Sequence, residues 1–281
     1  MKTMRIAITG GKGGTGKSVI STSLAGYLSK KNSVLLVDAD VDCPNDHLIL
    51  SIERKKLKEV KQMIPKWNFD RCIKCGKCSE ACKANAILQV KNKYPIFFRE
   101  QCNGCGACLL VCPENAITKS SKTVGNIFVG KNQNLSFLSG ELMPGELISE
   151  LIVDSLKKEI EGHYDFILID TAAGTHCDVI AALDGCDLAL AVTEPTPLGE
   201  HDLDLILQLT KKLDIPTKII LNRSDIAKKS KIKQIAKNYG VEMISEIPYS
   251  KKIQQQYSKG ELIKDKNIEK LAEKIEKMNK Q

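Results

Sequence analysis

Hydrophobic residues along this chain follow two alternating patterns. Short continuous apolar runs at 5–9 and 33–38 predict buried strands, and apolar residues three or four apart at 18–29 predict a helix. Strands that alternate with helices form a parallel sheet covered on both faces, so we expect an α/β fold. Later strands are expected at 126–130, 135–138, 164–170, 187–193, 217–222 and 241–247, and later helices at 147–160, 199–213, 228–239, near Gln254 and at 268–278.

The alternation is interrupted between residues 54 and 122. This segment holds eight of the 11 cysteines and carries 15 Lys or Arg against five Asp or Glu. Its net charge is therefore +10, whereas the rest of the chain sums to −2. We interpret the segment as a small domain inserted into the α/β domain, with expected boundaries of 1–57 and 123–281 for the α/β domain and 58–122 for the insert.

Composition excludes several classes of protein. With 281 residues, 42% hydrophobic and 27% charged, the chain is neither disordered nor a small disulfide-stapled scaffold. No stretch approaches the ~18 consecutive apolar residues of a membrane span, so we expect a cytoplasmic protein. In that reducing compartment, a cysteine-rich chain more often binds metal or performs redox chemistry than forms disulfides.

A glycine-rich segment follows the first predicted strand and precedes the first predicted helix. It reads G-K-G-G-T-G-K-S and matches the phosphate-loop pattern G-x-x-x-x-G-K-S. In such a loop, backbone N–H groups surround the phosphates, Lys17 reaches the β- and γ-phosphates and Ser18 offers its hydroxyl to Mg²⁺. A glycine turn without a ligand is the alternative, which the strand–loop–helix context disfavours. The expected nucleotide-binding residues here are Gly11, Gly13, Gly14, Thr15, Gly16, Lys17 and Ser18.

A second lysine, Lys12, makes the loop similar to the deviant phosphate loop of the MinD, ParA and nitrogenase-iron-protein ATPases. The resemblance covers nearly all of the chain outside the insert. It implies a parallel-sheet P-loop NTPase fold of the SIMIBI type, Mg-ATP hydrolysis and a homodimer in the ATP state. In that dimer, Lys12 is implied to reach the partner's phosphates and assist catalysis. A solvated surface lysine is the alternative.

Further residues follow the pattern of this family. Asp40 ends a V-D-A-D segment that resembles the first switch, and the resemblance implies that it contacts the attacking water. In the segment I-D-T-A-A-G, which resembles the second switch, Asp170 is implied to hold magnesium and Gly174 to approach the γ-phosphate. Asn222 resembles the residue that hydrogen-bonds adenine. Each also has a structural alternative, because an Asp or Asn at a strand end often caps a turn.

The cysteines of the insert occur in two runs of C-x2-C-x2-C-x3-C, the pattern of bacterial ferredoxins. In that pattern, three closely spaced thiolates hold one iron–sulfur cluster and the fourth crosses to the other. The resemblance implies a small α+β ferredoxin-like domain with two four-iron four-sulfur (4Fe-4S) clusters. Zinc ribbons also use C-x2-C pairs, but the doubled spacing disfavours zinc. The implied ligands are Cys72, Cys75, Cys78 and Cys112 for the first cluster, and Cys82, Cys102, Cys105 and Cys108 for the second.

Three cysteines lie outside the insert. Cys177 follows Asp170 by seven residues, the offset at which the nitrogenase iron protein has a cluster-bridging cysteine, and Cys43 lies within the first switch. We hypothesise that Cys177 and Cys43 hold a third metal or cluster in the ATP dimer. The alternative is that they act as small buried or interfacial hydrophobic residues. Cys186 is expected in the core.

These patterns favour an ATP-hydrolysing protein that couples dimer switching to electron transfer through the two clusters toward a partner metalloprotein. A basic insert favours an acidic redox or metalloprotein partner. Nucleic acid is disfavoured because stacking aromatics do not alternate with the lysines. Membrane binding is disfavoured because the helix expected at 268–278 lacks Trp and Phe. Two alternatives stay open: a metallochaperone or cluster-assembly ATPase, and a MinD-like spatial positioning ATPase.

Overall fold

A computed structural model describes residues 3–261 and 263–280 of the chain. The main sheet of these residues has nine strands. They are β1 (Met4–Thr9), β2 (Val34–Ala39), β3 (Lys55–Trp67), β6 (Ile117–Asn132), β7 (Leu135–Leu142), β8 (Phe166–Thr171), β9 (Leu188–Thr193), β10 (Thr217–Asn222) and β11 (Met243–Ile247). Their order across the sheet is β11-β10-β9-β1-β8-β2-β7-β6-β3.

Strands β11 to β7 of this order run parallel to one another, which confirms the predicted parallel α/β architecture. The opposite edge differs from the expectation. There β6 pairs antiparallel with β7, and β3 pairs antiparallel with β6. Only Gln133 and Asn134 separate β6 from β7, and Gln133 takes a positive φ of 52°. A connection this short permits only a hairpin, whereas parallel strands need a longer crossover.

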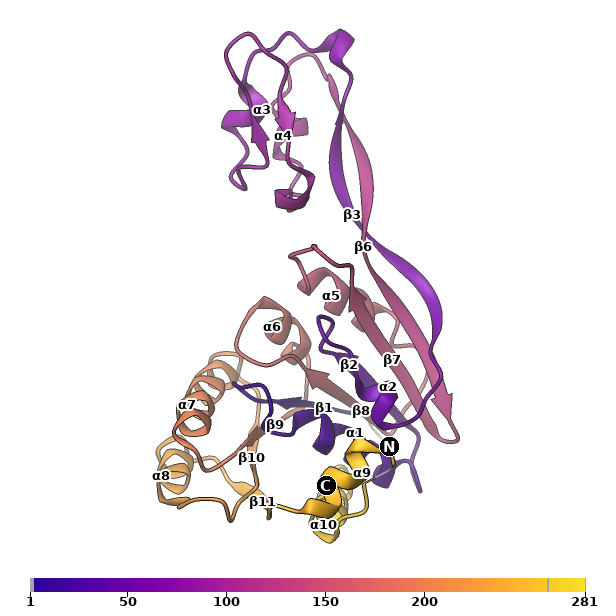
Figure 1. Cartoon of the computed structure of the whole chain (residues 1–281), viewed down its shortest axis with the longest axis vertical. Helices are drawn as coiled ribbons and strands as arrows, with labels where there is room; N and C mark the ends of the chain where they lie inside the picture. Colours follow the sequence, from indigo (N-terminus) through magenta and orange to yellow (C-terminus); the bar gives the residue numbers. More distant parts are fainter. Residues whose placement is uncertain (1–2, 262, 281) are drawn as a thin grey trace.

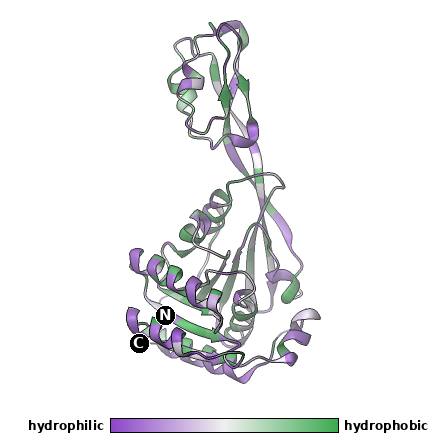
Figure 2. Cartoon of the chain, turned by 60° about the vertical axis from the view of Figure 1, so that its left-hand side comes forward, coloured by the Kyte–Doolittle hydropathy of each residue, from purple (hydrophilic) through white to green (hydrophobic). Residues whose placement is uncertain are grey.

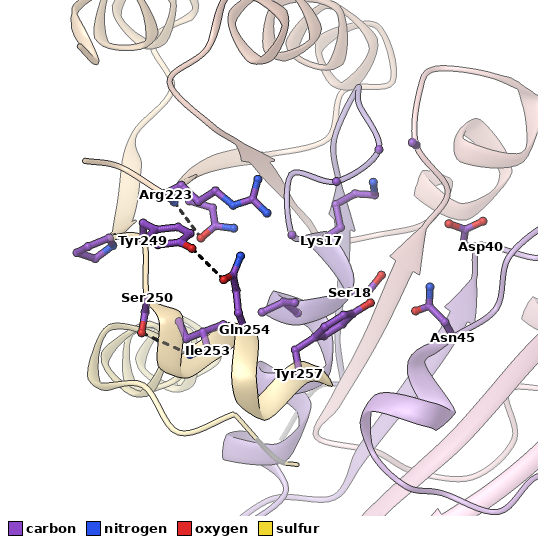
Figure 3. A pocket seen from close by; sticks show the side chains of 17 residues that line it. Lys17, Ser18, Asp40, Asn45, Arg223, Tyr249, Ser250, Ile253, Gln254 and Tyr257 are labelled. Carbon is purple, nitrogen blue, oxygen red and sulfur yellow. Dashed lines mark hydrogen bonds between the residues drawn. The ribbon is translucent and has the colours of Figure 1, made fainter. Parts of the chain in front are cut away.

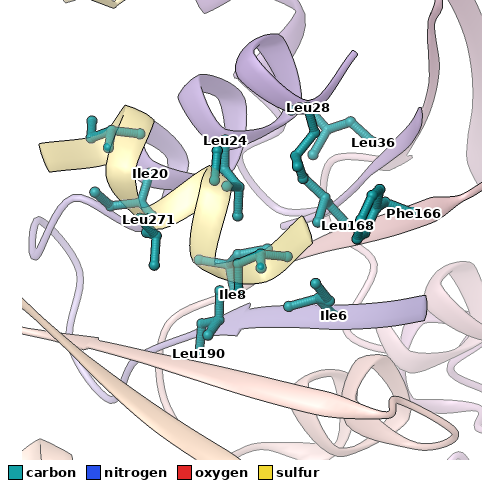
Figure 4. Close-up of a cluster of buried hydrophobic side chains, with 14 of the residues drawn as sticks. Ile6, Ile8, Ile20, Leu24, Leu28, Leu36, Phe166, Leu168, Leu190 and Leu271 are labelled. Atoms are coloured by element: carbon teal, nitrogen blue, oxygen red, sulfur yellow. The ribbon is translucent and has the colours of Figure 1, made fainter. Parts of the chain in front are cut away.

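Helices cover both faces of the parallel strands (Figure 1). They are α1 (Lys17–Leu28), α2 (Asp46–Ile49), α5 (Glu150–Lys158), α6 (Cys177–Leu183), α7 (Pro197–Lys212), α8 (Ser230–Tyr239), α9 (Lys251–Ser258) and α10 (Lys266–Met278). On one face, Ile6 and Ile8 pack with Leu24 of α1 and Leu271 of α10 (Figure 4). Ala7 points to the other face, because side chains alternate along a strand. Both faces of the parallel strands are therefore buried.

The C-terminal helix α10 packs on the sheet, as its apolar spacing predicted. Ile268, Leu271 and Ile275 are buried in the same cluster as α1. Asp265 caps the helix, since its Oδ1 accepts hydrogen bonds from the backbone N–H groups of Asn267 and Ile268 at 2.8 and 3.3 Å. None of the helices in the described part of the chain has both the length and the apolar character needed to cross a membrane.

Strands β3 and β6 form a long antiparallel arm that leaves the edge of the sheet (Figure 1). Pairing in the arm continues to Trp67 opposite Ile117, whereas β6 pairs with β7 only from Gly125 onward. The register shifts between Val60 and Lys61. Such a bulge bends a strand and increases its twist. The far half of the arm therefore projects beyond the sheet.

The tip of the arm carries residues 68–116, which we call the cysteine module. Its elements are the 3-10 helices η1 (Phe69–Arg71) and η2 (Arg99–Gln101), the short helices α3 (Lys77–Glu80) and α4 (Ala107–Leu110), and the paired strands β4 (Ile87–Leu88) and β5 (Ile96–Phe97). Figure 2 shows hydrophobic residues concentrated in the strands inside the body, while the outer helix surfaces are more hydrophilic. The predicted boundaries near 58 and 122 fall within β3 and β6, so the domain division stays a prediction.

Candidate functional site

The phosphate loop connects β1 to α1, as the sequence predicted. Gly14 and Gly16 have φ angles of 81° and 95°, a conformation that side chains disfavour. A β-carbon on Gly16 would lie only 2.3 Å from Nδ2 of Asn222. That Nδ2 donates a hydrogen bond of 2.8 Å to the carbonyl of Thr15. Asn222 therefore braces the loop from the end of β10, and only glycine fits opposite it.

A cavity of about 540 Å³ opens beside the loop. This volume lies within the range of roughly 300–1,000 Å³ that is typical of small-molecule sites. Figure 3 shows Lys17 and Ser18 between Asp40 on one side and Tyr249 with Gln254 on the other. The cavity thus has one end lined by the Lys17 ammonium and the Ser18 hydroxyl, and another end lined by an aromatic ring and an amide.

Two aspartates meet at the carboxyl ends of β2 and β8. Asp38 lies opposite Asp170 in the register of these neighbouring strands, and each is 1% exposed. Neither carboxylate oxygen of Asp170 accepts a hydrogen bond of normal geometry from a described residue, although the Ser18 hydroxyl is close enough to act on its charge. Burial raises the pKa of Asp170 to about 6, and Ser18 and Lys17 oppose that rise. A buried carboxylate without a partner, next to a serine hydroxyl, fits a hydrated magnesium ion.

Asp46 is a third buried acid that sequence reasoning missed. It is fully buried, and both of its carboxylate oxygens lack a hydrogen-bond partner within the described ranges. Its backbone N–H donates to Oδ2 of Asp38 at 3.1 Å. Burial, followed by the charge of Asp170, raises its pKa well above the ordinary value. An Asp in the first turn of a short helix is common, so no sequence pattern distinguishes Asp46 from an ordinary helix residue.

Asp40 lines the cavity, as expected for a residue near the reacting phosphate. Burial raises the pKa of its carboxyl, and the Lys17 ammonium partly offsets that effect. Gly174 lies on the other switch, with a φ of 101°, and its N–H donates to the carbonyl of Gly10 at 3.2 Å. This bond ties the second switch to the start of the phosphate loop.

Lys12 is held within its own chain. Its Nζ lies 3.3 Å from Oε1 of Glu194, and the side chain of Glu194 is only 7% exposed. Oε2 of the same carboxylate accepts a hydrogen bond of 2.9 Å from Nη1 of Arg223, which lines the cavity. Sequence reasoning missed Glu194, because a carboxylate just after a strand carries no signal of its distant partners.

The eight cysteines of the module surround two small cavities. Together with the three other cysteines, all are free thiols. Gly76, Gly104 and Gly106 turn the chain between them with φ angles of 85°, 76° and 77°. The first cavity is lined by Cys72, Cys75, Cys78 and Cys112, and the second by Cys82, Cys102, Cys105 and Cys108. The structure thus brings together the same two sets of four that the ferredoxin spacing implied.

Four thiols line each of these cavities, and thiolates are ligands for soft metal ions and iron–sulfur clusters. Trp67 lines the first cavity, and its buried indole Nε1 makes no hydrogen bond of normal geometry with a described residue, although it lies close enough to the Cys78 thiol to offset part of the rise that burial causes in the pKa of that thiol. Such an N–H can donate to a sulfur atom. Burial raises the pKa of Cys108 to about 11, so its thiolate needs a cation to form. Within residues 3–261 and 263–280, no group of three or more His, Cys, Asp or Glu side chains is arranged to hold a metal ion.

Cys43 and Cys177 are both exposed. The backbone N–H of Cys43 donates to the carbonyl of Asp40 at 3.1 Å, and Cys177 is the first residue of α6. Cys43 therefore lies in the segment predicted to be the first switch, Cys177 follows the segment predicted to be the second, and the third metal site stays a prediction. Cys186, expected in the core, is instead half-buried and packs against two hydrophobic clusters. Burial raises the pKa of its thiol to about 12, and its sulfur lies 3.4 Å from the carbonyl of Ala182.

Several known proteins are similar to this chain in sequence or in fold. It is 37% identical over 260 residues to an uncharacterised protein of Methanocaldococcus jannaschii, a match that covers 92% of this chain and 90% of the relative. It is 22% identical to an iron-sulfur cluster carrier protein of Pyrococcus horikoshii, over 87% of this chain and 73% of the relative. The fold is similar to that of the septum site-determining protein MinD complexed with Mg-ADP from Pyrococcus horikoshii, with a TM-score of 0.62 and 19% identity over 99% of this chain and 97% of that one.

The match to a protein family agrees with the phosphate loop, the parallel sheet and the cavity beside it. Residues 6–263 match the CobQ/CobB/MinD/ParA nucleotide binding domain. The matched range runs from β1 to the segment before α10 and includes the arm and the cysteine module. The chain therefore belongs to the CobQ/CobB/MinD/ParA family of nucleotide-binding proteins.

Proposed function

We propose that this protein hydrolyses Mg-ATP and couples the resulting dimer switching to electron transfer through two 4Fe-4S clusters toward a partner metalloprotein. One observation carries the proposal: two cavities, each lined by four cysteines, lie at the tip of an arm whose strands continue into the nucleotide-binding sheet. The arm thus connects the nucleotide site to the two cysteine-lined cavities through continuous strands. This connection suits a protein in which one site controls the other.

The nucleotide half of the proposal rests on the loop and the two switches. Lys17 would bind the β- and γ-phosphate oxygens, and Ser18 with Asp170 would hold magnesium, for which the unpartnered Asp170 carboxylate is suited. Asp40 would orient the attacking water from the cavity wall. At the end of the cavity away from Lys17, Tyr249 and Gln254 would offer a ring and an amide to the base. Asn222 supports the phosphate loop through its hydrogen bond to the Thr15 carbonyl.

Lys12 would act in a homodimer. Family resemblance implies that it reaches the phosphates bound by the partner, where its charge would stabilise the transition state. In the single chain it is paired with Glu194 at 3.3 Å. Catalysis in the dimer therefore requires Lys12 to exchange Glu194 for a phosphate.

The cluster half of the proposal rests on the cavities. A cubane is larger than one ion, so its four thiolate ligands stand around a space, and four cysteines line each of the two cavities. When bound, such clusters supply storage for one electron each. The buried Trp67 N–H would donate to cluster sulfur, and the net positive charge of segment 54–122 would offset the anionic clusters and attract an acidic partner.

Anaerobic reconstitution followed by electron paramagnetic resonance tests this function. The full chain is expected to hold about eight iron atoms and to show two interacting 4Fe-4S signals after reduction with dithionite. Mg-ATP is expected to shift their potential or coupling, whereas Mg-ATP added to Lys17→Ala should not. Clusters whose potential and coupling stay the same when Mg-ATP is added to the wild-type protein would contradict the coupling of ATP to electron transfer.

A second candidate is a cluster-transfer ATPase. The similarity to an iron-sulfur cluster carrier protein and the exposure of Cys43 and Cys177 favour it. This function predicts additional labile iron in the ATP dimer that disappears in Cys177→Ala. Unchanged iron per dimer in that variant would contradict it.

A third candidate is a spatial positioning ATPase, favoured by the structural similarity to the septum site-determining protein MinD. It predicts that the protein co-sediments with liposomes in the presence of Mg-ATP. Because α10 buries its apolar residues against the sheet, we expect no co-sedimentation.

A further inference from the structure

Lys122, on β6, is a buried lysine at the junction of three parts of the molecule. It is 2% exposed, and lysine is almost never buried to this extent unless it is paired. Its Nζ lies 2.5 Å from Oε2 of Glu146 and donates a hydrogen bond of 3.2 Å to the carbonyl of Arg99. One ammonium group thus joins the arm, the cysteine module and the segment that follows β7.

Gln62 reinforces this contact from the other strand of the arm. It lies directly opposite Lys122 in the β3–β6 register, so the two side chains point to the same side of the arm. Gln62 is 4% exposed, and its Nε2 donates to the carbonyl of Cys102 at 2.5 Å. The carbonyl of Arg99 also accepts a hydrogen bond from the Cys102 N–H. The arm therefore grips both ends of the Arg99–Cys102 turn, which leads into the cysteines of the second cavity.

On the side of the body, Glu146 belongs to a tight turn beside the first switch. Its N–H donates to the carbonyl of Met143 at 3.1 Å, and the Met143 N–H donates to the carbonyl of Val124 on β6 at 2.9 Å. The preceding residue, Leu142, donates to the carbonyl of Val41 at 2.8 Å. Val41 directly follows Asp40, so this turn contacts the backbone of the first switch.

We propose that Gln62, Lys122 and Glu146 form a clamp that transmits movement of the first switch to the Arg99–Cys102 turn of the cysteine module. Each link is a backbone hydrogen bond or a buried polar contact. Separating the partners of a buried ion pair leaves an uncompensated charge, which is energetically costly. We therefore expect the segments that Lys122 joins to move together. These are positioning residues, and the regulation assigned to them rests on the proposed function, in which ATP moves the switch.

Hydrogen–deuterium exchange on the full-length, anaerobically prepared protein tests the clamp. Without nucleotide, Lys122→Met is expected to raise amide exchange at least threefold at both 99–102 and 143–146, because each segment loses its buried anchor. Glu146→Gln is a milder variant that should show the same pattern if Lys122→Met does not fold. Lys218→Met is the matched control: its ion pair with Glu242 spans 2.7 Å at the surface, and its loss should leave both segments unchanged.

Nucleotide tests the transmission. Mg²⁺ with a non-hydrolysable ATP analogue is expected to alter exchange at 99–102 in the wild-type protein and in Lys218→Met, and not in Lys122→Met. Unaltered exchange at 99–102 in both clamp variants without nucleotide would overturn the clamp. A wild-type protein that binds the analogue by calorimetry and shows no change at 99–102 would overturn the transmission. If the proposed function is wrong, the protein will bind no analogue or no iron. In that case, the comparison of exchange between the wild-type protein and the variants without nucleotide still tests the clamp.

Discussion

The nucleotide-binding edge of the sheet and the cysteine module assemble their functional side chains in different ways. At the edge, Asp38 meets Asp170 because two strands that are distant in sequence lie in register. In the module, three cysteines of each set come from one short stretch, and glycines such as Gly76 and Gly106 turn the chain between them. Only the fourth cysteine crosses over.

This difference teaches that the two regions depend on different interactions. The edge is positioned by the core of the sheet, in which β1, β2 and β8 are buried on both faces. The module has a much smaller core that includes the cysteines themselves, together with Ile87 and Ile117. A module of this size is expected to rely on its bound group for stability. Substitutions should therefore disable one region and spare the other.

The largest expected effect separates the two regions. Lys17→Ala should lower ATP hydrolysis by roughly 100- to 1,000-fold, because it removes a charge that stabilises the transferring phosphate. Iron content should not change, since Lys17 lies at the opposite end of the arm from the module. A phosphate-release assay and an iron assay measure both, with the exposed Lys237→Ala in α8 as the control. A Lys17→Ala variant that hydrolyses ATP at close to the wild-type rate would contradict the assignment of the nucleotide site.

A smaller effect is expected at Glu194. Glu194→Gln should raise the rate of ATP hydrolysis by about fivefold at protein concentrations that limit dimer formation. In the wild-type protein, Lys12 must first break its ion pair with Glu194, which costs about 1 kcal/mol, and the variant lacks this pair. Nucleotide affinity must be measured alongside, since Arg223 loses the same partner. Glu242→Gln, which removes a surface pair, is the control. Slower hydrolysis in Glu194→Gln would show that Glu194 assists catalysis instead of restraining Lys12.

The module can be perturbed on its own. Cys108→Ala should lower iron content about twofold, because one of two four-iron sites loses a buried ligand, while ATP binding stays at the wild-type level. Cys186→Ala, which alters a half-buried cysteine outside the module, should keep all of the iron. Equal iron in both variants would contradict the assignment of the second cavity.

The smallest expected effect concerns pH. Burial, and then the charge of Arg54, lower the pKa of His47 below its ordinary value of 6.5. The unfolded chain therefore binds this proton more readily, so the contribution of His47 to stability is present above pH 6.5 and is lost as the pH falls from there through the lower pKa of the folded protein. Chemical denaturation at pH 7.5 and 5.5 should show a larger loss for the wild-type protein than for His47→Asn. Parallel losses would contradict the shift.

Sequence reasoning found the residues that local patterns define. The phosphate loop is contiguous, and the resemblance of the cysteine runs to bacterial ferredoxins implied the two groups of four that line the cavities. Glu194, Asp46 and Lys122 were missed because their importance comes from partners that are remote in sequence. The antiparallel edge was missed for a related reason: β6 and β7 read as two ordinary apolar strands, and only the two-residue connection between them determines their direction.

The bulge in the arm has a mechanical consequence. It lies where β6 leaves the sheet: Gly125 is still paired with β7, the Val124 carbonyl accepts a hydrogen bond from Met143, and Lys122 is paired with Glu146. Beyond these contacts, residues 117–121 span roughly 17 Å at about 3.4 Å per residue. A rotation of about 5° at this point would displace the far end by about 1.5 Å over that length. The arm is therefore a lever with its fulcrum at the sheet edge, and it enlarges small rotations of the body into displacements of the cysteines.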